Sequence, residues 1–112
     1  MTGKRTKVVL TVDTEASIAG AFGGNDACTP LIHELVAGMV GGRSEGLGFL
    51  VETLSRYGLI ATFFVETTQT RYFPDSVMGD YVDGLMPAGQ DIQLHLHPCW
   101  LAFENGKLDL SN

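Results

Sequence analysis

The chain has 112 residues, the length of one small domain or of part of a larger one. Hydrophobic residues make up 45% and charged residues 18%, which excludes an intrinsically disordered chain. Seven Lys and Arg stand against 13 Asp and Glu without a basic stripe, so we expect no binding to nucleic acid or membranes, and a neutral substrate or a metal cation suits the charge better.

The N-terminus resembles a signal peptide only in part. A basic cluster precedes Val8–Leu10, but Asp13 and Glu15 interrupt the apolar run before an h-region of about 7–15 residues can form. No apolar run approaches the roughly 20 residues of a membrane helix. The two cysteines, Cys28 and Cys99, make no disulfide framework, so a cytoplasmic location is the simplest expectation.

Three segments have the composition of β-strands. Residues 7–13 and 60–65 are apolar, β-branched runs without alternation, which is typical of strands covered on both faces. We therefore expect the first of them to be a buried strand. Residues 91–96 alternate between polar and apolar side chains and predict a third strand.

Two helices are predicted between these strands. The first has apolar residues at helical spacing over 47–57, with Ser44 as its expected N-cap and Gly58 directly after its end. The second lies between Pro74-Asp75 and Pro87. Its apolar stripe has a period of 3.6 residues and consists of Val77, Met78, Tyr81, Val82 and Leu85.

Residues 14–43 are irregular and hold six of the 14 glycines, although a short helix over residues 30–39 is predicted, with Leu31, Leu35 and Val36 facing inward. The order strand, helix, strand, helix, strand predicts an α/β fold with a parallel sheet and right-handed crossovers. We expect a single unit over residues 1–112, without an internal boundary. In such sheets the functional groups gather at the carboxyl ends of the strands.

Ionisable side chains follow each of the predicted strands. Asp13 and Glu15 end the first, Glu66 the second, and His95 and His97 the third. Each pair has a spacing of two, which places both side chains on one side of an extended backbone. Two imidazoles and two carboxylates at one rim favour zinc, with manganese, cobalt or iron as the other candidates.

Ordinary structural roles compete with this interpretation. The acidic pair alone is equally typical of a helix N-cap followed by a solvated acid, and the histidine pair alone of loop residues; it is their joint occurrence that favours a site. We interpret Glu66 as a commonplace acid after a strand, and His33 as a surface histidine. Cys99 is compatible with a small buried residue. Trp100 and Phe103 are expected to pack the loop beneath the site.

Three blocks in this order resemble the polysaccharide deacetylase (NodB-type, carbohydrate esterase 4) family. They are residues 10–15 (LTVDTE), 57–66 (YGLIATFFVE) and 89–98 (GQDIQLHLHP), and the likeness is closest to the branch that opens with T-x-D-T-E. The match covers roughly residues 7–101. Each block alone is a weak signal, whereas the three together are specific.

The resemblance implies a distorted (β/α) barrel that removes acetyl groups from sugar amides or esters with a divalent metal, usually zinc. By resemblance, Asp13 would be the general base, while Glu15 and His95 would bind the metal. The family's second histidine ligand lies four residues after the first, where this chain has Cys99. Either the Cys99 thiolate replaces it or His97 is the second ligand, and we expect His97 because it shares a face with His95.

The family's later motifs have no counterpart in these residues. They supply an arginine that orients the base, and a histidine that acts as general acid. A complete barrel of this type needs roughly 250 residues. We therefore expect the N-terminal part of a deacetylase-like barrel, or a shortened relative, with weak zinc binding and little or no turnover. The sheet edges that an unclosed barrel leaves predict a homo-oligomer.

Three other interpretations stay open. A haloacid-dehalogenase-like enzyme would use Asp13 as nucleophile, but its magnesium ion prefers oxygen ligands and has little use for His95 and His97. An amidohydrolase-like barrel would carry its His-x-His pair on the first strand, and here the pair is on the third. The last is a non-catalytic, metal-binding fragment.

Overall fold

Strands and helices alternate along the chain, as the sequence predicts. The computed structural model describes residues 3–19, 30–32 and 36–109. In chain order the main elements are β1 (Thr11–Thr14), α2 (Leu47–Arg56), β4 (Thr62–Glu66), α3 (Asp75–Leu85) and β5 (Asp91–His95). Two short hairpins add β2 (Met39–Val40) with β3 (Arg43–Ser44) and β6 (Phe103–Glu104) with β7 (Lys107–Leu108). The 3-10 helices η2 (Thr68–Arg71) and η3 (Pro98–Ala102) follow β4 and β5.

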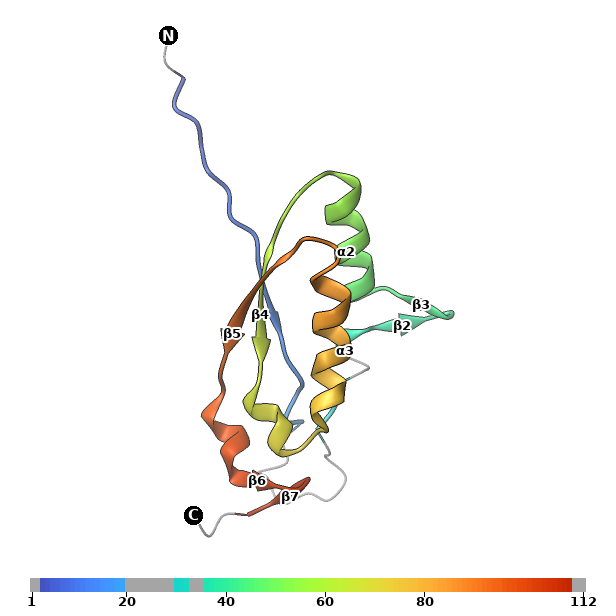
Figure 1. The fold of residues 1–112 in the computed structure, drawn as a ribbon, viewed down its shortest axis with the longest axis vertical. Coiled ribbons are helices and arrows are strands. Elements are labelled where there is room, and N and C mark those ends of the chain that lie inside the picture. The colour runs from blue at the N-terminus through green and yellow to red at the C-terminus, as the bar shows by residue number, and fades with distance from the viewer. Residues whose placement is uncertain (1–2, 20–29, 33–35, 110–112) are drawn as a thin grey trace.

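The central element is a parallel sheet in the order β1-β4-β5. Both crossovers step across the sheet in the same direction, so right-handed connections place α2 and α3 on the same face. Figure 1 shows the three strands running in one direction, with both helices beside them. The expected α/β class with a parallel sheet is confirmed, and these three strands form an open sheet rather than a closed barrel.

The core lies between the sheet and the two helices. Phe63 and Val65 of β4 are buried against Leu54 of α2 and against Met78 and Leu85 of α3. Phe63 and Leu85 have no exposed surface. Burial of side chains of this size is worth about 1.5–3 kcal/mol each, so this contact fixes the sheet on its helices.

The start of α2 depends on two glycines that allow close approaches. The N-cap of α2 is Gly46 and not the predicted Ser44, although Ser44 Oγ still accepts the Gly48 backbone N–H at 2.9 Å. A Cβ on Gly46 would lie 2.5 Å from the Val36 carbonyl oxygen, and one on Gly48 would lie 2.7 Å from the Ser44 Cβ. The packing of this turn therefore favours glycine at both positions.

The helix predictions are confirmed in α3 and need one correction in α2. Met78 and Leu85 are buried, and the other members of the α3 stripe pack against the core. Gly58 follows α2 with φ +62°, as expected of the residue that ends a helix. Tyr57, however, is 69% exposed, because the helix ends at Arg56 and the chain turns away from the core there.

The expectation of a buried strand from residue 7 is wrong for residues 7–10. The strand begins at Thr11, and Val8 is 88% exposed. The neighbouring strand β4 begins at Thr62, whose N–H bonds the Leu10 carbonyl, so earlier residues have no partner in it. Figure 1 shows this N-terminal segment projecting beyond the sheet.

Of the predicted helix over residues 30–39, the structure describes residues 30–32 and 36–39, and of these Val36 is helical. The Val36 N–H donates to the Ile32 carbonyl at 2.8 Å and Val36 is buried. Leu31 instead pairs with Ser17 in an isolated bridge and is 39% exposed, and Met39 belongs to β2. Leu35 lies outside the described residues.

An aromatic cluster packs the end of the molecule beyond the strand ends. Trp100 and Phe103 are each 2% exposed and contact Tyr72 and Phe73, which confirms that they pack this loop region. Within the residues described, no helix has the length and apolar character needed to cross a membrane.

Candidate metal centre

Residues at or just after the carboxyl ends of three neighbouring strands lie together at one rim of the sheet. Glu66 at the end of β4 lies directly opposite His95 at the end of β5. Glu15 follows the last residue of β1, and His97 lies two residues beyond β5. The parallel pairing of the strands therefore brings together groups that are up to 82 positions apart, from Glu15 to His97.

Backbone contacts beyond the strands hold this rim in place. The Thr67 N–H donates to the His95 carbonyl at 3.2 Å, which continues the pairing of β4 with β5. The Thr68 hydroxyl lies 3.0 Å from the His97 carbonyl oxygen. On the other side, the N–H of Ala16 donates to the buried Gln69 Oε1 at 2.8 Å and so ties the segment after Glu15 to η2.

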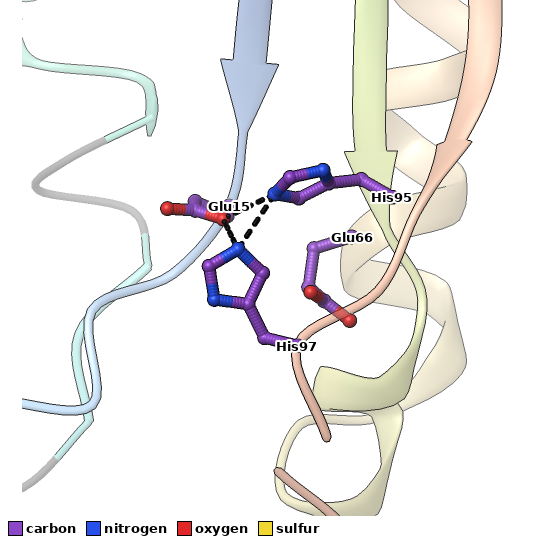
Figure 2. A group of neighbouring side chains, drawn as sticks. All are labelled: Glu15, Glu66, His95 and His97. Atoms are coloured by element: carbon purple, nitrogen blue, oxygen red, sulfur yellow. Dashed lines mark hydrogen bonds and ion pairs between the residues drawn. The ribbon is translucent and has the colours of Figure 1, made fainter. Parts of the chain in front are cut away.

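The side chains of Glu15, His95 and His97 meet at three atoms. Glu15 Oε2 lies 2.9 Å from His95 Nε2 and 3.0 Å from His97 Nε2, and the two Nε2 atoms lie 2.7 Å apart. Figure 2 shows these contacts as a triangle between the strand ends. The three side chains are partly exposed, so the triangle is open to solvent on one side.

With Glu15 ionised, protons on the imidazoles alone do not satisfy this triangle. If both Nε2 atoms carry hydrogen, both can donate to Glu15, but then two N–H groups face each other. If only one carries hydrogen, it serves one partner and a lone pair still faces a lone pair. One cation bound by all three atoms removes the conflict, and a donor set of two imidazoles and a carboxylate suits zinc. The residues therefore fit the metal that the resemblance implies.

Glu66 is the fourth member of the group. One ligand atom each from Glu15, Glu66, His95 and His97 lies within 4.8 Å of the others. Glu66 has no exposed surface, and Figure 2 shows its side chain beside the two histidines. Among the described residues, these four form the one group of His, Cys, Asp or Glu side chains that lie close enough together to hold a metal ion.

Asp13, the expected base, lies near this cluster but outside it. It pairs with Phe64 in the register and shares the sheet face of Glu66 and His95. It is exposed, and with Glu15 it lines a small hollow of about 130 Å³ beside Leu47. Its side chain is therefore open to solvent at this edge of the sheet.

The alternative ligand Cys99 does not join the cluster. Its side chain is exposed in η3, whereas His97 Nε2 lies against both Glu15 and His95. The placement agrees with the preference for His97. Exposure of Cys99 also corrects the reading that it is a small buried residue. Cys28 and His33 lie outside the described residues.

Glu66 belongs to the cluster, although the sequence alone indicates only a commonplace acid after a strand. A lone acid after a strand carries no local signal. The informative pattern is non-local, since Glu66 ends the middle strand between Glu15 and the histidines. A sheet order placing the second strand in the centre would have pointed to it.

Comparison with known proteins gives no family assignment. No model of a protein family, no curated protein and no solved structure matches the chain. The functional interpretation therefore depends on the geometry of the rim and on the sequence blocks.

Proposed function

We propose that the chain forms the metal-binding part of a hydrolase of the polysaccharide deacetylase type, built as the N-terminal part of a (β/α) barrel. Its substrate would be an acetylated sugar or a related small molecule. The edge strands β1 and β5 would continue the sheet in the barrel or pair with a second copy of the chain.

The single observation that carries the proposal is the triangle of Glu15, His95 and His97. Two of these residues occupy the positions that the resemblance gives to metal ligands, and all three meet within 3.0 Å. A site that must release a product needs access, and the partial exposure of this triangle supports that use.

Each chain residue has a distinct part in the proposed reaction. A bound divalent cation such as zinc would polarise the acetyl carbonyl and favour deprotonation of water at the site. Glu15, His95 and His97 would hold the cation. Asp13, exposed on the same sheet face, would take the proton from the attacking water, and general-base catalysis of this kind contributes roughly 10²–10⁴-fold.

A non-catalytic metal-binding unit is the second candidate. It is favoured by the count of protein groups at the rim, because four groups can fill the coordination positions of a zinc ion. Catalytic zinc sites usually have three protein ligands and keep one position open. The two candidates differ in turnover and agree in metal binding.

Acetate release from N-acetylated chitooligosaccharide separates the two candidates. With zinc present, we expect slow release by the wild-type chain and a rate lower by about 100-fold in Asp13→Asn, whose zinc affinity stays unchanged. Asp83→Asn on the exposed side of α3 is the matched control and should keep the wild-type rate. Equal release by wild type and Asp13→Asn would contradict the catalytic proposal and favour the metal-binding unit.

A further inference from the structure

Glu66 is a fully buried carboxylate that uses only part of its hydrogen-bonding capacity. Its Oε1 accepts the Thr68 backbone N–H at 2.6 Å and also contacts the Thr68 hydroxyl. Its Oε2 is buried and has no hydrogen-bond partner among the described residues. The turn at Thr68 thus leaves one buried oxygen of Glu66 without a partner, and a ligand atom of Glu66 lies within 4.8 Å of those of Glu15, His95 and His97.

The charge of Glu66 is likewise uncompensated. The ion pairs of the described residues join other side chains, and none joins a basic residue to Glu66. An isolated carboxylate in a protein interior is strongly unfavourable, and buried charges are normally paired or bind metals. A divalent cation at the neighbouring triangle would provide the missing positive charge.

We propose that Glu66 is the fourth protein ligand of the cation and that Thr68 is its positioning residue. This inference rests on the metal site of the proposed function. The four ligand atoms lie within 4.8 Å of one another, whereas ligands of four-coordinate zinc lie about 3.3 Å apart. Glu66 therefore moves toward the other three groups on binding, while Thr68 limits its rotation.

A fourth protein ligand changes what the chain does with the ion. Two imidazoles and two carboxylates complete a four-coordinate zinc site and leave no open position. Glu66 would then compete with substrate for the cation. Occupation of the fourth coordination position by Glu66 would therefore contribute to the slow turnover expected of this chain.

Zinc affinity of the full chain, measured by competition with a chromophoric chelator, tests this inference. Glu66→Gln keeps the shape of the side chain and should weaken zinc binding by about 100-fold. Thr68→Val should weaken it by about tenfold, as typical of groups that orient a ligand, and Thr68→Ser should restore it. Glu104→Gln, an exposed acid on β6, is the matched control and should bind as wild type does.

Two further readouts separate a ligand from a structural carboxylate. The visible absorption of bound cobalt responds to its ligand set, so Glu66→Gln should change the spectrum and Glu104→Gln should not. Without metal, Glu66→Gln should be at least as stable as wild type, because it removes an uncompensated buried charge. If Glu66 had only a structural role, Glu66→Gln would instead be less stable than wild type and would leave the cobalt spectrum unchanged.

The outcomes distinguish this inference from the metal site itself. If Glu66→Gln binds zinc within about threefold of wild type and with the wild-type cobalt spectrum, Glu66 is not a ligand. The metal site still stands in that case if His95→Ala loses zinc binding by about 100-fold or more. If His95→Ala also binds as wild type does, both the site and the proposed function are wrong.

Discussion

The two faces of the β1-β4-β5 sheet carry different kinds of side chain. On the face covered by α2 and α3, Phe63 and Val65 are buried in the core. On the opposite face, β4 presents Phe64 and Glu66 between the exposed Asp13 of β1 and Gln93 of β5. One strand therefore contributes to the core through one face and to the proposed metal site through the other.

This division separates the polar groups of the rim from the apolar packing of the core. The contacts that repel or remain unsatisfied without a cation lie at the strand ends of the polar face. The packing that offsets their cost lies on the other face, around Phe63 and Leu85. Changes on the helix-covered face should alter folding stability, whereas changes at the rim should alter zinc binding.

The largest expected effect comes from two adjacent phenylalanines on opposite faces. Phe63→Ala removes a fully buried ring and should lower the free energy of unfolding by about 3–5 kcal/mol. Phe64→Ala removes a half-buried ring and should cost about 1 kcal/mol. Urea denaturation of the two variants measures the difference. Equal losses would remove the distinction between the faces, and the milder pair Phe63→Leu and Phe64→Leu serves if Phe63→Ala does not fold.

An intermediate effect is expected when zinc is added. A ligand at 100 times its Kd that binds only the folded state stabilises it by about 2.7 kcal/mol. Wild type and Leu85→Ala should both gain this free energy, because Leu85 belongs to the helix-covered face. His97→Ala should gain almost none, as denaturation with and without zinc would show. A full gain in His97→Ala would place the bound ion elsewhere.

A smaller effect is expected at the start of α2. Ser44→Ala removes the oxygen that accepts the Gly48 N–H, and loss of such a cap costs about 1 kcal/mol of stability. Because Ser44 lies on the helical side, zinc affinity should not change. A loss of zinc binding in Ser44→Ala would show that the two faces are coupled.

The sequence predicts the elements whose signals are local. The stripe of α3, the glycine after α2 and the alternation of strands with helices follow from spacing and from single residues, and the structure confirms them. The expected group of Glu15, His95 and His97 also follows from local signals, because Glu15 and the two histidines each stand at the end of a predicted strand.

The errors arise where pairing between distant segments decides. Residues 7–9 have the composition of a strand but no partner in β4, and Leu31 pairs with Ser17 instead of continuing a helix. The place of Glu66 opposite His95 likewise depends on the register of β4 with β5. Composition and periodicity do not predict which residues of two distant strands lie opposite each other.

The most direct test of the metal centre is a zinc titration of the full chain by isothermal calorimetry. Wild type should bind one zinc ion, and His95→Ala should bind it at least about 100-fold more weakly while keeping its fold. His33→Ala is the matched control, because sequence analysis assigns no ligand role to this third histidine of the chain. Zinc binding by His95→Ala with the wild-type affinity and stoichiometry would contradict the account.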